Sequence, residues 1–209
     1  FRRTGRGLEL TRDGQAWLSE LSAIFTRLRE ANRRLRRRAK GERPVVSLTT
    51  LPSFGARWLV PRLGGFIAKH PELDLRISAS EAVVDFTREP IDVGIRFGPG
   101  PYPGLLAEKL FDDYFVIVAA PVKAARVKKP ADLLRQTLLV DDHEDAWPRC
   151  FAALGVTAPP LTRYHQHTDS SFLVEAAVRG QGVAMGRWSL IQDELSAGRL
   201  LRIFPSAAP

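Results

Sequence analysis

The longest uninterrupted helical pattern in the chain runs from Arg12 to about Lys40. This stretch contains no proline, and Thr11 before it is a typical N-cap residue. Its apolar residues recur at alternating spacings of four and three, which is a heptad seam. A seam on so polar a helix favours packing on a second helix, so we predict a homodimer, with packing on the chain's own body as the alternative. The seam residues are Trp17, Leu21, Ile24, Leu28, Ala31 and Leu35.

Charge is concentrated at the same end of the chain. Residues 1–43 hold 13 lysines and arginines against 5 acidic residues, whereas the remainder holds 18 of each. A basic head on a neutral body predicts that a polyanion would bind the head. Residues 1–10 predict a tight hairpin whose tip carries Arg2, Arg3 and Arg6. These arginines favour phosphate contact, and a solvated surface turn is the alternative.

Composition limits the class of protein. Of the 209 residues, 44% are hydrophobic and 26% charged, which is typical of a soluble globular chain of one or two domains. No apolar run approaches the ~18 residues of a membrane helix. A single cysteine, Cys150, excludes an internal disulfide framework, and with no signal-peptide pattern this predicts a cytoplasmic protein. The chain begins with Phe1 and ends soon after an apolar run, so we expect a fragment.

The pattern changes at residues 41–44, which contain glycine and proline and predict a hinge. Beyond it, strand-like and helix-like segments alternate, which predicts an α/β body with largely parallel pairing. Pro61 lies inside one helical segment and must kink it or start a second helix. The expected strands are 45–49, 73–78, 91–97, 105–110, 115–119, 137–140 and 182–185, and the expected helices are 53–70, 131–135, 147–154 and 171–179.

Reactive residue types do not assemble into a catalytic or metal-binding pattern. The acidic cluster 141–145 lacks the spacing of a calcium loop, so a solvated loop is favoured over a cation site. His165 and His167 have strand spacing, but no further histidine or cysteine has ligand spacing. Cys150 is expected to be buried and structural. Since no nucleophile–base set, P-loop or dinucleotide fingerprint is present, we expect no enzyme activity, no cofactor and no metal.

A ligand cradle is the remaining candidate site. Ser53 stands where a strand passes into a helix and would cap that helix, and a second helix start lies near Thr168. Arg96 ends an expected strand, although a structural pair with Asp92 or Glu89 is its alternative. Ligands of open α/β sheets bind beyond the carboxyl ends of strands, so we predict a small-anion site. Its candidate residues are Thr50, Ser53, Phe54, Arg96, Thr168 and Asp169.

Several segments taken together resemble the LysR-type transcriptional regulators, most closely the branch of the glycine-cleavage-system activator and the β-lactamase regulator. The segments are R-R-T-G-R-G-L-E-L-T-R-D-G (2–14), R-W-L-V-P-R-L-G-G-F (57–66), H-P-E-L-D-L-R (70–76), V-D-F-T-R-E-P-I-D-V-G-I-R-F-G (84–98), P-G-L-L-A-E-K-L-F (103–111) and E-A-A-V-R-G-Q-G-V-A-M-G-R (175–187).

The resemblance implies a winged helix-turn-helix, a dimerising linker helix and a two-lobed effector domain like those of periplasmic binding proteins. Residues 1–40 would be the wing remnant and linker helix, 45–120 the first lobe, and 121–209 an incomplete second lobe. The wing arginines match a DNA-backbone contact. The implied function is a ligand-responsive DNA-binding regulator that senses a small anionic effector in an interlobe cleft, as a homodimer or, in full-length form, a homotetramer. A solute-binding module of a transport system is the alternative.

Overall fold

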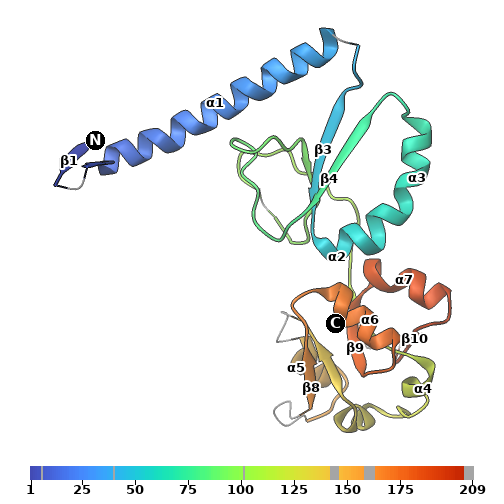
Figure 1. Ribbon diagram of the computed structural model, residues 1–209. Coiled ribbons are helices and arrows are strands. Elements are labelled where there is room, and N and C mark those ends of the chain that lie inside the picture. Colours follow the sequence, from blue (N-terminus) through green and yellow to red (C-terminus); the bar gives the residue numbers. More distant parts are fainter. Residues whose placement is uncertain (6, 40, 101, 142–145, 158–162, 205–209) are drawn as a thin grey trace. The chain divides into compact units, whose positions relative to one another are not determined.

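Figure 1 shows the computed structural model, which describes the chain except residues 6, 40, 101, 142–145, 158–162 and 205–209. Contacts divide the chain into two compact units. Unit 1 comprises Phe1–Leu51 and Gly64–Phe97, and unit 2 comprises Pro52–Leu63 and Gly98–Pro209. These limits differ from the expected lobes, because the expected first-lobe strand at 115–119 pairs with strands of unit 2. None of the helices described combines the length and apolar character needed to cross a membrane.

The basic head of unit 1 forms the expected hairpin and helix. Strands β1 (Arg2–Thr4) and β2 (Gly7–Glu9) pair antiparallel. Helix α1 (Arg12–Ala39) follows, and the Thr11 hydroxyl accepts a hydrogen bond from the Gly14 amide at 3.1 Å, which confirms the N-cap. The seam side chains are exposed in the single chain, with Trp17 67% accessible. This face of α1 therefore has apolar surface available for a partner.

The body of unit 1 is a parallel sheet in the order β4-β3-β5. Figure 1 shows its two longer strands side by side. The strands are β3 (Val45–Thr50), β4 (Asp74–Ala79) and β5 (Val93–Gly94). The first two confirm the expected strands to within a residue. The third is much shorter than the expected 91–97, because only its centre pairs with β3.

One continuous helical stretch follows β3 and passes from unit 2 into unit 1. It consists of α2 (Pro52–Phe54), a π-helical turn η1 (Gly55–Leu59) and α3 (Val60–Lys69). Pro61 lies in the first turn of α3, directly after the π-helical turn. A proline cannot donate the helical hydrogen bond, and an irregular turn beside it is the expected consequence.

Unit 2 contains a mixed sheet in the order β10-β6-β9-β7-β8. Strands β9, β7 and β8 run parallel, whereas β6 is antiparallel to β9 and to β10. The strands are β6 (Phe115–Ala119), β7 (Leu138–Val140), β8 (Tyr164–Gln166), β9 (Val183–Arg187) and β10 (Leu201–Arg202). The expected strands at 115–119, 137–140 and 182–185 are confirmed with small shifts of their ends.

Helices surround this sheet and complete the main core. They are α4 (Pro121–Ala124), the 3-10 helix η2 (Pro130–Arg135), α5 (Ala146–Ala153), α6 (Ser170–Val178) and α7 (Trp188–Ser196). Trp147 is buried on α5 and its indole donates to the Leu139 carbonyl at 3.0 Å. Cys150 is fully buried, as expected, and burial raises the pKa of its thiol to about 11.

In unit 2 one expected strand is missing, and helices α4 and α7 form where the sequence predicted no helix. The expected strand at 105–110 does not form, and within the described part of 98–114 Leu106 is 93% exposed. A strand needs a neighbouring ladder, and no strand pairs with this segment. Helix α7 was not expected. A Cβ on Gly186 would lie 2.6 Å from Ile191, so glycine is required for α7 to pack on β9.

Candidate functional site

Polar residues gather at the carboxyl edge of the parallel sheet in unit 1. Thr49 and Thr50 end β3, and Arg96 lies two residues beyond β5. The Arg96 guanidinium donates to the Thr49 hydroxyl at 3.2 Å, to the Ile95 carbonyl at 2.9 Å and to the Ala82 carbonyl at 3.3 Å. Arg96 is therefore oriented by bonds to three neutral oxygens beside the end of β3.

Thr50 has an unusual environment at this edge. Its side chain is fully buried, and its hydroxyl oxygen has no hydrogen-bond partner among the described residues. A buried hydroxyl without a hydrogen bond lowers the stability of the fold by about 1–3 kcal/mol. Such groups are rare in native proteins and often have a functional reason. A position at the carboxyl edge of a parallel sheet, where ligands bind in open α/β folds, makes Thr50 a candidate ligand contact.

Unit 2 has a second polar edge, formed where β7, β8 and β9 end. The Asp141 carboxylate, directly after β7, accepts a hydrogen bond from the Ser170 hydroxyl at 3.1 Å. The same Ser170 oxygen accepts from the Arg187 guanidinium at 3.2 Å. Ser170 begins α6 and Arg187 ends β9. The Ser170 hydroxyl donates to Asp141 and accepts from Arg187. It therefore links the ends of β7 and β9 to the start of α6.

Arg187 and Asp141 are both buried in this cluster, each with 8% of its surface exposed. Burial lowers the pKa of Arg187, and the carboxylates of Asp113, Asp141 and Asp169 oppose that change. Three acids surround one base. This cluster thus compensates its own cation and is suited to hold the fold together rather than to receive an anion.

The N-terminus of α6 is also occupied by the chain itself. Asp169 is the N-cap, and its carboxylate accepts from the Ser171 amide at 2.6 Å. The expectation of free amides for an anion at this helix start is therefore wrong, because a local carboxylate already takes that place. The expected cap role of Ser53 is also wrong, because α2 begins at Pro52 and Ser53 lies within its first turn.

The remaining candidates in unit 2 are an aromatic wall and an exposed hydroxyl. Phe54 is 9% exposed and stacks on Trp58, with ring centroids 4.9 Å apart. The ring centroid of Phe111 lies 6.1 Å from that of Phe54. Thr168 is exposed, just before the α6 cap. Of the six candidate residues, Thr50 and Arg96 lie in unit 1 and the other four in unit 2.

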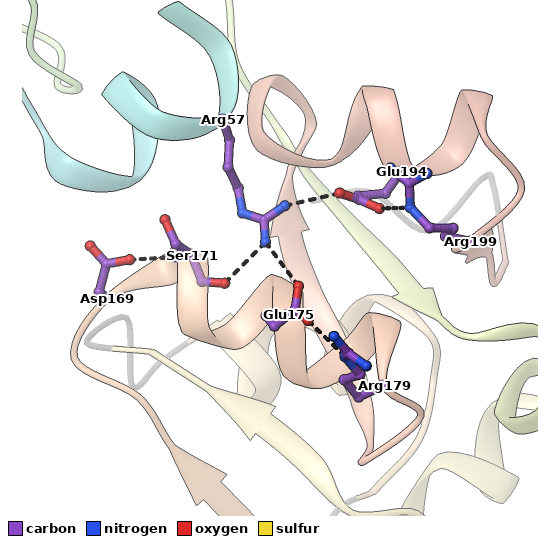
Figure 2. A network of polar contacts seen from close by, with 7 residues as sticks. All are labelled: Arg57, Asp169, Ser171, Glu175, Arg179, Glu194 and Arg199. Atoms are coloured by element: carbon purple, nitrogen blue, oxygen red, sulfur yellow. Dashed lines mark hydrogen bonds and ion pairs between the residues drawn. The ribbon is translucent and has the colours of Figure 1, made fainter. Parts of the chain in front are cut away.

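A network of ion pairs within unit 2 was not anticipated (Figure 2). Arg57, on the π-helical turn, contacts Glu194 of α7 at 3.1 Å and Glu175 of α6 at 3.8 Å. It also donates to the Ser171 carbonyl at 3.2 Å. The Arg57 side chain is only 16% exposed. It therefore fastens the segment after β3 to two helices of unit 2.

The other sequence candidates have simple environments. Arg2 pairs with Glu9 at 3.4 Å on the exposed hairpin, while Arg6 and residues 142–145 of the acidic cluster lie outside the described residues. His167 lies just after β8, and burial lowers its pKa, with the charge of His165 a smaller cause. Across the described part of the chain, no three histidine, cysteine or acidic side chains are grouped to hold a metal ion.

Sequence reasoning missed Arg57, Asp113 and Arg187. Arg187 ends a strand just as Arg96 was expected to, so the same strand-end argument could have selected it. Arg57 stands in the quoted motif R-W-L-V-P-R, but its partners lie more than 110 residues away. Asp113 contacts the start of α7 across 76 residues. Long-range partners of this kind leave no local signal.

Comparison with known proteins identifies the family. The model of the LysR substrate binding domain matches residues 39–209. The chain belongs to the LysR family. It is 37% identical over 205 residues to the glycine cleavage system transcriptional activator of Escherichia coli K12, covering 96% of this chain and 66% of that protein. It is also 37% identical over 206 residues to the transcriptional activator AmpR of Pseudomonas aeruginosa, covering 98% of this chain and 69% of AmpR.

Solved structures agree with the sequence relatives. The effector domain of AmpR from Pseudomonas aeruginosa superposes with a TM-score of 0.69 at 36% identity, covering 79% of this LysR chain and 81% of that structure. The resemblance to LysR regulators and the α/β effector-domain fold are thereby confirmed. Because these relatives are transcriptional regulators, the solute-transport alternative is not favoured. The LysR chain spans just under two thirds of the length of the Escherichia coli activator.

Proposed function

We propose that this LysR chain is the effector-binding part of a ligand-responsive, DNA-binding transcriptional regulator. The observation that carries the proposal is the match to the LysR substrate binding domain over residues 39–209, beside a basic head at residues 1–43. The matched part would sense a small molecule, and the head would lie against DNA. A protein that senses a ligand and binds DNA can make the occupancy of a promoter depend on that ligand.

The proposed effector is a small anion, bound at the carboxyl edge of unit 1. Arg96 supplies a guanidinium that is already oriented by neutral oxygens. A guanidinium can bind a carboxylate with two parallel hydrogen bonds. Thr50 supplies a buried hydroxyl that has no hydrogen-bond partner among the described residues. Because the α6 N-terminus is capped by Asp169, the anion proposal now depends on Arg96 and Thr50 rather than on helix dipoles.

The head is proposed to bind the phosphate backbone of DNA through Arg2, Arg3 and Arg6. Arg2 and Arg3 are exposed on β1, and the Arg2–Glu9 pair is solvated enough to be exchanged for a phosphate. Phosphate contacts set affinity and salt dependence but do not read sequence. The head is therefore a positioning element of the regulator.

A salt titration of DNA binding tests this proposal. Residues 1–209 should bind duplex DNA without sequence preference and lose affinity steeply as salt is added. Arg2→Ala or Arg3→Ala should reduce the slope of log K against log salt by roughly one unit each. Arg76→Ala, an exposed arginine on β4, is the matched control and should leave the slope unchanged. An unchanged slope in the head variants would remove the head from the DNA interface.

The regulator is also proposed to form a homodimer through the exposed seam of α1. Leu21→Asp combined with Leu28→Asp should yield monomers in sedimentation, because burying an unpaired carboxylate against apolar side chains costs several kcal/mol. Ser22→Asp with Arg29→Asp, on the same helix but off the seam, is the control and should remain dimeric. A dimer that survives the seam variant would contradict the proposal.

A further inference from the structure

A second basic surface lies on unit 2, in the segment that joins β6 to β7. Residues 121–136 carry five cations and one acid, whereas the charges of residues 44–209 as a whole balance. All of these cations except the half-buried Lys123 are exposed. We call them the unit 2 basic patch, and its members are Lys123, Arg126, Lys128, Lys129 and Arg135.

The patch is not neutralised by neighbouring acids. In the described part of the chain none of its five cations forms an ion pair. Other cations of unit 2 do form them, among them Arg57, Arg62, Lys109, Arg179 and Arg199. The positive charge of the patch is therefore available to a partner from outside the chain.

Asp132 is the one acid of the segment, and the backbone is its main partner. Its carboxylate accepts hydrogen bonds from the amides of Lys128 and Lys129 at 2.9 and 3.0 Å. These bonds lower the pKa of Asp132, and the charges of Lys129 and Arg135 contribute less. The amides at the start of η2 are thus already occupied. A partner would meet the side chains of the patch rather than a helix N-terminus.

The patch lies at the opposite end of the unit 2 sheet from the cluster of Asp141 and Arg187. Strand β6 is antiparallel to β9, and β7 is parallel to β9, so the end of β6 and the start of β7 share the amino edge of the parallel strands. Small ligands of open α/β sheets bind at the carboxyl edge instead. A macromolecule is therefore a better candidate partner for the patch than a small ligand.

Two apolar side chains are exposed among these cations. Val122, beside Lys123, is 61% exposed, and Leu134, beside Arg135, is 41% exposed. The phosphate backbone of DNA would satisfy the charges, but it offers no apolar side chains to cover the valine and the leucine. Protein interfaces combine an apolar centre with a polar rim. The mixed surface therefore favours an acidic protein over DNA.

We propose that the unit 2 basic patch, together with Val122 and Leu134, is a docking surface for an acidic protein that also presents apolar side chains. The inference goes beyond the proposed function, because neither the effector edge of unit 1 nor the DNA contact of the head uses these residues. Carboxylates of the partner would pair with the cations, and its apolar side chains would cover Val122 and Leu134. Opposite charges would speed association and make the affinity fall as salt is added.

Fluorescence anisotropy with two synthetic peptides of equal length and charge tests the proposal. One interleaves glutamates with leucines, and the other has serine in place of each leucine. Chain 1–209 should bind the leucine peptide more tightly. Combining Arg126→Gln, Lys128→Gln and Lys129→Gln should weaken that binding about tenfold, because three exposed ion pairs are lost together. The denaturant midpoint should not change, since the amides that bond to Asp132 remain.

Two further variants are controls for charge and for apolar contact. Arg2→Gln with Arg3→Gln and Arg12→Gln removes three exposed cations from the head and should leave the leucine-peptide affinity unchanged. The same variant should weaken binding to duplex DNA, which the patch variant should not. Val122→Ser should weaken binding of the leucine peptide but not of the serine peptide.

Three results would overturn the inference. One is a leucine peptide that does not bind the unsubstituted chain, or that binds the patch variant equally well. Another is equal affinity for the two peptides, which would reduce the patch to a general attraction for polyanions. The third is a loss of duplex DNA binding in the patch variant as large as in the head variant, which would assign the patch to DNA. A head that binds no DNA would contradict the proposed function and leave the peptide result standing.

Discussion

In unit 1 the arginine at the strand end, Arg96, is held by neutral oxygens, whereas in unit 2 the corresponding arginine, Arg187, is held among carboxylates. Bonds to carbonyl and hydroxyl oxygens orient a guanidinium without cancelling its charge. Carboxylates orient it and cancel its charge as well. The edge of unit 2 is therefore suited to support the fold, whereas the edge of unit 1 is the one that we propose for the effector.

The largest expected effect on stability comes from replacing Arg187, the cation that the carboxylates of unit 2 compensate. Arg187→Met should lower the free energy of unfolding by about 3–5 kcal/mol, because it leaves the buried Asp141 and the half-buried Asp113 and Asp169 without the cation that compensates them. Denaturant unfolding measures this loss. Arg179→Met is the control: Arg179 is 72% exposed in its pair with Glu175, and its removal should cost less than about 1 kcal/mol. Similar losses in both variants would show that Arg187 supports the fold no more than an exposed ion pair does.

A smaller effect separates the two neighbouring threonines of unit 1. Thr49→Val removes the hydroxyl that accepts from Arg96 and should cost about 1–3 kcal/mol, the range for bonds to a charged group and for a partner left unsatisfied. Thr50→Val removes a buried hydroxyl without a partner in the described chain, and should leave stability unchanged or raise it by about 1 kcal/mol. Thermal unfolding of the two variants measures both changes in stability. Destabilisation by Thr50→Val would mean that its hydroxyl serves the fold.

Local sequence patterns predicted the elements that local physics determines. The helix expected over 12–40 and its Thr11 cap depend on neighbours along the chain, and both were found. The apolar segments 45–49 and 115–119 were also found as strands, because each has other strands beside it. The strand expected at 105–110 failed because an extended segment is a strand only when another strand pairs with it.

The site was predicted less completely, because its polar groups are satisfied over long sequence distances. Helix α7 has no cap from its own N-cap residue. Its Ser189 amide and hydroxyl instead bond to Asp113, 76 residues earlier. Asp169 was expected near a ligand and proves to cap α6. Composition and spacing can suggest that a carboxylate lies at a helix start, but only the fold shows which donor it has taken.

Calorimetry on Arg96→Gln, with a panel of small mono- and dicarboxylates as probes, tests the central proposal most directly. If unit 1 receives an anion through Arg96, affinity for the best carboxylate should fall by about 1.5–3 kcal/mol with little change in melting temperature. Arg76→Gln, the exposed control in unit 1, should bind as the unsubstituted chain does. Intact affinity together with a lowered melting temperature would assign Arg96 to the fold and contradict the account, as would a wild-type chain that binds no carboxylate.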